Sequence, residues 1–308
     1  MSGDQQQRLT SGKSDAIPRI WDSYRYRDRI PPRGLLVDGR PAFTGIEPDR
    51  VGRYVVISVR DPLGGSMESH ARDLAGAFGS PEQAGSTALF QTWTASLQGE
   101  AVTVIATGSG GPEIELALHE LTTHTGADTF LFFGTAAGLH PKVRPGDVVI
   151  SAGAVRDEGM TQAHVRQSFP ALAAYDVVSA LAGAGNELGV SFHVGVTRSS
   201  DSDTVGVGRP GIDGYMQPEH ADLIDYYVRA GVLSNDREVS AVLTLATLSG
   251  RRGGAVLGVT DNHTIGEQLQ PGAGSAEARA VLRRGLQRLI EFDGDSARLG
   301  RRYWSLSD

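Results

Sequence analysis

The stretch VTVIATGSGGPEIELALHELTTHTGADTFLFFGT, residues 102–135, decides the fold. An apolar, β-branched run over Val102–Ala106 ends in the glycine turn Gly108–Gly111. Apolar side chains at helical spacing follow, and a second apolar run covers Thr129–Phe133. Strand, glycine turn, helix and strand in this order are typical of a βαβ unit in a parallel sheet.

Two glycine-containing segments, Gly108–Gly111 and Gly134–Thr135, each follow one of these strands. Ligands of parallel sheets bind at the carboxyl ends of strands, and we expect both segments to form turns at neighbouring strand ends. Glycine lets backbone N–H groups approach a polar or anionic ligand, and a following helix adds its positive end. The alternative, that both are ordinary tight turns, stays open.

The rest of the chain also alternates strands and helices, which favours one α/β domain without internal repeats. Further strands are expected at Tyr54–Val59, Ala88–Leu97, Gly146–Ala154, His193–Asp201 and Ala255–Val259. Further helices are expected through Ala71 and Leu74 and over Val177–Leu188, Pro218–Ala230, Glu238–Leu248 and Ala276–Ile290. We place the domain at residues 41–294, after an extension (1–40) that is mobile over about its first 18 residues and before a tail (295–308).

Composition narrows the function classes. The 308 residues include no cysteine, and a net charge of −7 with interspersed signs argues against a nucleic-acid surface. There is no apolar run of the roughly 18 residues that a membrane helix needs, and no hydrophobic signal segment at the start. We therefore expect a cytoplasmic metabolic enzyme with no nucleic-acid or membrane partner. No metal-ligand cluster or dinucleotide fingerprint occurs, so neither metal nor cofactor is expected.

Several blocks resemble the uridine-phosphorylase branch of the nucleoside phosphorylase/nucleosidase family. They are TGSGGPEIELALHEL (107–121), GADTFLFFGTAAGL (126–139), KVRPGDVVISAGAVRDEG (142–159), HVGVTRSSDS (193–202) and GRRGGAVLGVTDN (250–262). The similarity extends from about Phe43 to Ile290. It implies a single three-layer α/β/α domain with a mixed, distorted central sheet. It also implies cleavage of the N-glycosidic bond of a nucleoside by a homo-oligomer, commonly a dimer or a trimer of dimers.

The chain departs from this family at the anion pocket. Related phosphorylases hold phosphate with three arginines, and here Gly64, Ala88 and Phe132 stand at those positions. A charge-assisted hydrogen bond contributes roughly 1.5–3 kcal/mol. With only Thr135 and the backbone around Gly110 remaining, we expect no phosphate binding in the manner of the family.

Two neighbouring residues could change the chemistry of that pocket. Arg60 is a candidate replacement for the lost arginines, and Asp61, or another carboxylate, is a candidate for orienting a water molecule.

The ribose corner is better preserved. The family's Glu-Met-Glu triplet corresponds to Asp236, Arg237 and Glu238, and the resemblance assigns Glu238 to the sugar hydroxyls, with Thr135 nearby. Such a carboxylate can also stabilise a developing oxocarbenium charge. Arg237 replaces an apolar methionine, so it points either to solvent or to an anionic group of the substrate. Glu238 as a merely solvated helix-start residue is the alternative.

The base pocket is altered. Arg209 of the family's Gln-x-Arg pair is retained, Val207 stands for the glutamine, Asp203 replaces an aromatic residue, and Gly138 lines the pocket. Recognition of plain uracil should therefore be weakened.

Val259–Asn262 resembles instead the Val-Ser-Asp element of purine phosphorylases and adenosine-type nucleosidases, whose aspartate assists the leaving base. Asp261 is thus a candidate general acid, or alternatively a helix N-cap. His263 is interpreted as structural.

Three functions remain open, in this order of preference: a nucleoside hydrolase, a phosphorylase with a pocket rebuilt on Arg60 and Thr135, and a non-catalytic nucleoside binder.

Overall fold

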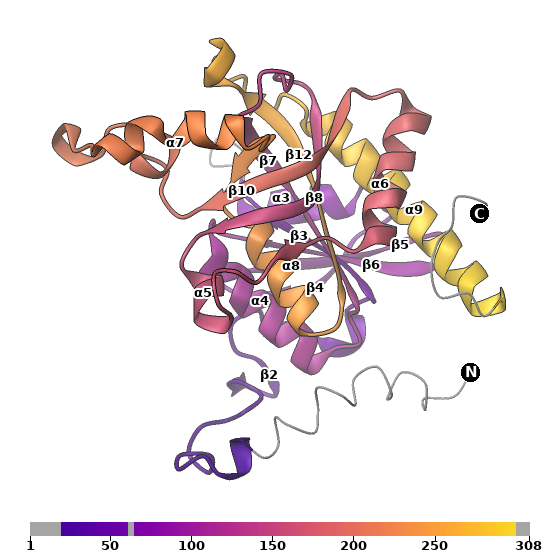
Figure 1. Cartoon of the computed structure of the whole chain (residues 1–308). Helices are drawn as coiled ribbons and strands as arrows, with labels where there is room; N and C mark the ends of the chain where they lie inside the picture. The colour runs from indigo at the N-terminus through magenta and orange to yellow at the C-terminus, as the bar shows by residue number, and fades with distance from the viewer. Residues whose placement is uncertain (1–19, 61–64, 300–308) are drawn as a thin grey trace.

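The computed structural model describes residues 20–60 and 65–299, in which a ten-stranded central sheet lies between two layers of helices and β1 and β2 form a separate small sheet (Figure 1). The strands are β1 (Leu36–Val37), β2 (Arg40–Pro41), β3 (Tyr54–Val59), β4 (Glu82–Ser86), β5 (Gln91–Leu97), β6 (Glu100–Thr107), β7 (Thr129–Gly138), β8 (Val148–Asp157), β9 (Ala171–Leu172), β10 (Phe192–Ser200), β11 (Ser234–Asp236) and β12 (Arg252–Asp261). The helices are α3 (Met67–Ala75), α4 (Gly111–His124), α5 (Met160–His164), α6 (Tyr175–Leu188), α7 (Pro218–Arg229), α8 (Val239–Leu248) and α9 (Ser275–Leu299).

Alternation along β3 explains the layers. Val55 and Ile57 pack into the cluster that includes α4 and α8, while Tyr54 and Val56 face the cluster with α3, α6 and α9. Successive side chains of a strand point to opposite faces, so a continuous apolar run is buried on both sides. The expected three-layer α/β/α domain with a mixed central sheet is confirmed.

The sheet closes on itself at one end. Its order is β11-β10-β8-β12-β7-β3-β6-β5-β4, and β11 also pairs with β7. The strands β7, β12, β8, β10 and β11 therefore form a ring, in which β12 runs parallel to β7 and antiparallel to β8. This ring brings residues that are distant in sequence to the end of β7.

Two expectations about the glycine segments are wrong. First, β3 lies between β6 and β7, so these two strands are not neighbours. Second, Gly134–Thr135 is not a turn, because β7 continues to Gly138 in register with β12. Gly134 instead makes room for a ring, since a Cβ atom there would lie 2.8 Å from Cε1 of Phe132.

Element ends differ from the sequence expectations in other places. The expected strand at Ala88–Leu97 begins only at Gln91, because Thr87 holds a tight turn by accepting the N–H groups of Leu89 and Phe90. The polar strand β4 was not expected and forms by pairing with β5. Helix α9 continues past the expected boundary at residue 294.

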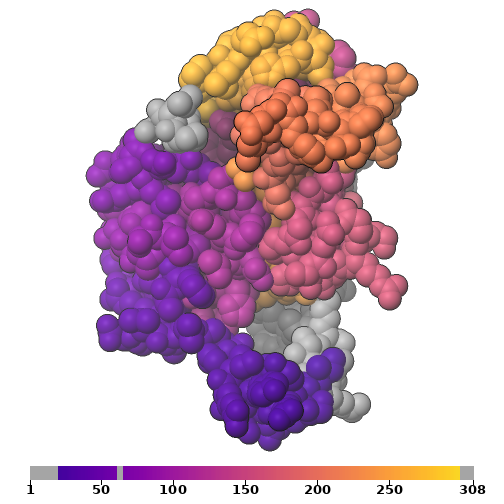
Figure 2. Space-filling model, turned by 90° about the vertical axis from the view of Figure 1, so that its left-hand side faces the viewer, coloured from indigo at the N-terminus to yellow at the C-terminus, as the bar shows by residue number. Residues whose placement is uncertain are grey.

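The segment 20–41 stands off the body as a lobe (Figures 1 and 2). It is anchored where Arg33 donates to the carbonyl of Thr123 at the end of α4 (2.9 Å). The first 18 or so residues, expected to be mobile, lie outside the described residues. None of the helices in the described ranges is long and apolar enough to cross a membrane.

Candidate active site

The glycine turn after β6 donates its N–H groups to carboxylates of the same chain. Gly108 N donates to Oε2 of Glu113 (2.9 Å), which also accepts from Oγ1 of Thr107 (2.7 Å). Gly110 N donates to Oε1 of Glu238 (2.7 Å), and Ser109 Oγ donates to the same atom (3.0 Å). The side chains of Glu113 and Glu238 thus bind the backbone donors that the resemblance assigns to phosphate.

Gly110 has a backbone requirement of its own. Gly110 precedes α4, and its φ of 108° lies in the region that favours glycine. This conformation directs the N–H of Gly110 toward Glu238. The glycine expected in the anion pocket therefore lies at the site, and its role here is to bind Glu238.

The two acidic residues of the ribose corner are buried together. Asp236 ends β11 and Glu238 precedes α8, with exposed fractions of 5% and 6%. Asp236 accepts from Ser199 Oγ (2.6 Å) through Oδ1 and from the N–H groups of Glu238 (3.0 Å) and Val239 (2.8 Å) through Oδ2. Asp236 is therefore the positioning carboxylate that fixes the start of α8, and Glu238 is the one that faces the glycine turn.

Burial raises the pKa of both groups. Loss of hydration, followed by the charge of Asp236, raises the pKa of Glu238 to about 7. Loss of hydration also raises the pKa of Asp236 to about 6, against the opposing hydrogen bonds from Ser199 and the backbone. Burial therefore favours the protonated form of both carboxyl groups relative to an exposed Asp or Glu.

Asp261 reaches the same region through the register of β7. Ala137 of β7 is the partner of Asp261 on β12 and of Asn235 on β11. Neighbouring strands lie about 4.8 Å apart, so the expected general acid and the ribose corner flank one residue of β7. Gly138, the next residue, is buried, and a Cβ atom there would lie 2.9 Å from Nδ2 of Asn262.

A chain of polar groups leads away from Asp261. Thr260 Oγ1 donates to its Oδ1 (2.8 Å), and Nε2 of His263 lies 3.2 Å from its Oδ2. Nη2 of Arg209 lies 3.1 Å from the same nitrogen of His263. His263, which sequence reasoning treated as structural, therefore lies between the retained arginine of the base loop and the expected general acid, and its Nε2 either accepts from Arg209 or donates to Asp261.

The remaining base-loop residues lie beside this chain. Val207 is half-buried in the 3₁₀ turn η2 (Val205–Val207), whereas Asp203 is exposed. Asp203 makes no hydrogen bond to another described residue, so the structure gives no account of its expected place in the base pocket.

The anion-pocket residues are only partly assembled. Phe132 is 1% exposed and belongs to the apolar core, and Ala88 is exposed on the loop between β4 and β5. Thr135 is exposed on β7. Arg60 N donates to the carbonyl of Thr107 (3.2 Å), which places Arg60 beside the glycine turn. Asp61 and Gly64 lie outside the described residues.

Arg237 is held by the chain. Its Nη2 donates to the carbonyl of Asp201 (3.0 Å), and its half-buried side chain lowers the pKa of Glu238, against the larger effect of burial. Its Nε is buried and has no hydrogen-bond partner among the described residues. The side chain of Arg237 is therefore held against the base loop, and the choice between solvent and an anionic group of the substrate stays open.

Sequence reasoning missed two further charged residues. Glu113 is the third residue of α4, where an acidic side chain commonly turns back to free N–H groups, and this position was its signal. Arg198 is 2% exposed on β10, donates to Asp157 (2.8 Å) and Asn235 (2.9 Å), and covers the ring of Tyr227. An arginine inside a buried strand requires such partners, which was its signal.

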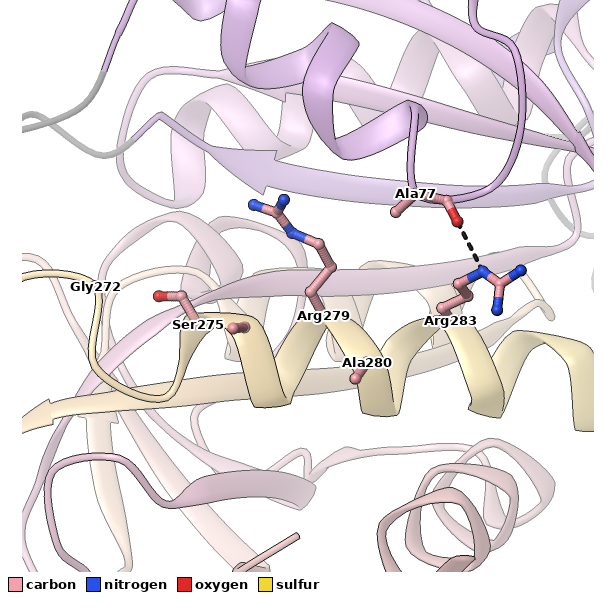
Figure 3. A pocket seen from close by; sticks show the side chains of 7 residues that line it. Ala77, Gly272, Ser275, Arg279, Ala280 and Arg283 are labelled. Carbon is pink, nitrogen blue, oxygen red and sulfur yellow. Dashed lines mark hydrogen bonds between the residues drawn. The ribbon is translucent and has the colours of Figure 1, made fainter. Parts of the chain in front are cut away.

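Two features lie outside this site or are absent from it. The described residues contain no group of three His, Asp or Glu side chains that could hold a metal ion. A groove of about 490 Å³ lies elsewhere, between α9 and the segment after α3, where Arg283 Nε donates to the carbonyl of Ala77 (2.8 Å) and Arg279 extends from the same helix (Figure 3). None of its lining residues is a candidate site residue.

Comparison with known proteins shows the family to which the chain belongs. Residues 57–292 match the model of the Phosphorylase superfamily. A uridine phosphorylase of Thermococcus kodakarensis is 34% identical over 270 residues, covering 87% of this chain and 93% of the relative. A uridine phosphorylase of Salmonella typhimurium is 33% identical over 217 residues (70% and 83%), and a guanosine phosphorylase of Halorubrum lacusprofundi is 30% identical over 174 (56% and 66%). The chain therefore belongs to the Phosphorylase superfamily, as a uridine-phosphorylase-like member.

Proposed function

We propose that this protein cleaves the N-glycosidic bond of a nucleoside and that water, not phosphate, accepts the sugar. The observation that carries the choice of water is the occupied glycine turn: Gly108 N and Gly110 N are engaged by Glu113 and Glu238. An incoming phosphate dianion would meet these two carboxylates at the turn. Burying an anion without compensating charge is costly.

The surrounding residues suit the bond cleavage. Glu238 in its ionised form accepts hydrogen bonds from two ribose hydroxyls and stabilises positive charge on the sugar. Asp261 gives a proton to the departing base, whose nitrogen keeps the electron pair of the broken bond. Water supplies a hydroxyl group to the anomeric carbon and releases its other proton to a base.

Phosphorolysis is the second candidate, because Arg60 lies beside the turn through its bond to Thr107. One arginine would then replace three. The relatives named above carry phosphorylase names, which is the further reason for keeping this alternative.

The sugar product separates the two reactions. We expect incubation with uridine, guanosine and adenosine to release base with free ribose, at the same rate with and without millimolar phosphate. Ribose 1-phosphate that appears only with phosphate would contradict hydrolysis and favour Arg60 as an anion ligand, and Arg60→Gln should then raise the KM for phosphate.

We further propose a nucleoside as the sole small-molecule partner and a homo-oligomeric assembly, the common state that the family resemblance implies.

A further inference from the structure

Glu113 presents one oxygen that is fixed and one that is available. Its Oε2 accepts from Gly108 N (2.9 Å) and from Thr107 Oγ1 (2.7 Å). Among the described residues, its Oε1 receives no hydrogen bond from any donor. The side chain is half-buried, so water can reach it. The carboxylate is thus held firmly while one of its oxygens remains able to accept a proton.

The position of this oxygen relative to the sugar follows from the glycine turn. Glu113 binds the N–H of Gly108, and Glu238 binds the N–H of Gly110, two residues along. Alpha carbons two residues apart lie within about 7 Å, so both carboxylates bind the same short turn. Glu238 is the residue proposed to hold the ribose hydroxyls, and the shared turn is the reason for assigning Glu113 to the same site.

Charge argues against a purely structural role. A carboxylate that caps the start of a helix only accepts from one or two free N–H groups. A water molecule or a serine hydroxyl could accept from the same groups. Here the carboxylate lies at the turn that the resemblance assigns to anion binding, and Glu238 binds the same turn. A tethered anion of this kind excludes a free one and orients a water molecule in its place.

We propose that Glu113 is the general base of the reaction, a step that rests on the proposed hydrolysis. Glu113 Oε1 accepts one proton from the attacking water, and the water oxygen forms the bond to the anomeric carbon. The glycosidic bond breaks with its electron pair on the base nitrogen, which takes a proton from Asp261. Atoms and charge balance, since one water enters and free sugar and free base leave.

Glu113→Gln is the sharpest test, because its amide oxygen can still accept from Gly108 N and Thr107 while its charge is lost. General base catalysis contributes about 10²–10⁴-fold. We expect kcat for base release to fall by about that factor, with KM and the melting temperature nearly unchanged. Glu115→Gln is the matched control: Glu115 lies two residues along α4, and its side chain is 41% exposed and paired with His164. It should retain wild-type kcat.

A second variant guards against a structural explanation. Glu113→Ala opens the pocket, and formate should restore part of its kcat by taking the place of the carboxylate. Wild-type kcat in Glu113→Gln, or a loss in both variants without any response to formate, would overturn the assignment while leaving hydrolysis intact. Ribose 1-phosphate as the wild-type product would instead remove the proposed function itself.

Discussion

At the scale of single residues, Glu238 and Asp236 combine a proposed role in ribose binding with a cost to folding. Both are almost fully buried, and their pKa values are raised to about 7 and about 6. A carboxyl group whose folded pKa lies above its unfolded pKa favours the folded state only while it is protonated. For Glu238, the stabilisation is complete below pH 4.5 and is lost as the pH rises through about 7.

Glu238→Gln should therefore be more stable than the wild type at pH 8, by on the order of 1–3 kcal/mol, and equally stable near pH 4. The same change weakens two charge-assisted hydrogen bonds to the ribose, so kcat/KM should fall by about 100-fold. Thermal unfolding at the two pH values and a nucleoside assay measure both effects. Glu219→Gln, at an exposed position in α7, is the control. A destabilised variant at pH 8 would show that the charge of Glu238 is better compensated than its surroundings indicate.

At the scale of elements, β10 connects the ribose corner to the base loop. Ser199 binds Asp236, and the preceding Arg198 donates to the carbonyl of Gly206, to Asn235 and to Asp157. Adjacent residues of one strand thus serve opposite faces, one fixing the acidic pair and the other fixing the loop that carries Arg209. The loop geometry consequently depends on a side chain that contacts neither base nor sugar.

Arg198→Met should keep most of the buried volume but leave the Gly206 carbonyl and Asn235 without a donor. We expect a loss of roughly 2–4 kcal/mol of stability and a rise in KM that exceeds the fall in kcat. Denaturant unfolding, steady-state kinetics and hydrogen exchange over residues 201–217 measure these effects. Arg229→Met removes an arginine of α7 that is 81% exposed, and it should change none of them. Equal KM values in both variants would separate Arg198 from base binding.

The elements also show what the sequence could predict. Runs such as Tyr54–Val59 predict strands well, because burial on both faces leaves only apolar residues. Glu238 and Asp261 were found through family motifs, and the structure brings them to one end of β7. The second pairing of β7 with β11 could not be predicted, since long-range strand pairing leaves no local pattern. The same holds for Glu113, whose partners are backbone N–H groups that every residue carries.

At the scale of the whole molecule, Asp293 ties the last helix to the sheet. It accepts from Tyr54 of β3 (2.6 Å) and from Arg252 of β12 (2.6 and 2.9 Å), which also donates to Asp176 of α6 (3.0 Å). These hydrogen bonds outweigh the opposing effect of burial and lower the pKa of Asp293. Burial, followed by the hydrogen bond to Asp293, raises the pKa of Tyr54. Three elements, α9, β3 and β12, therefore meet at the carboxylate of Asp293, and Arg252 connects them to α6.

Asp293→Asn should destabilise the protein by about 2–4 kcal/mol at pH 7, because Arg252 keeps a buried charge with a weaker partner. A depressed carboxyl pKa stabilises the fold above the unfolded value of 3.8, and this contribution is lost as the pH falls through the lower folded value. The difference between variant and wild type should accordingly shrink at acidic pH, as followed by thermal unfolding. Asp295→Asn, at an exposed position two residues along, should have little effect. A pH-independent difference would assign the loss to packing.

The carboxylates that engage the glycine turn after β6 also bear on the direction of metabolism. Phosphorolysis stores the energy of the broken bond in a sugar phosphate, so such a reaction can be driven backward to rebuild a nucleoside. With water as the acceptor, the sugar leaves without that activation and the step runs one way. Under the proposed hydrolysis, a cell using this protein would recover bases from nucleosides and could not rebuild nucleosides by the same route. The released sugar would need a separate kinase before it could be used again.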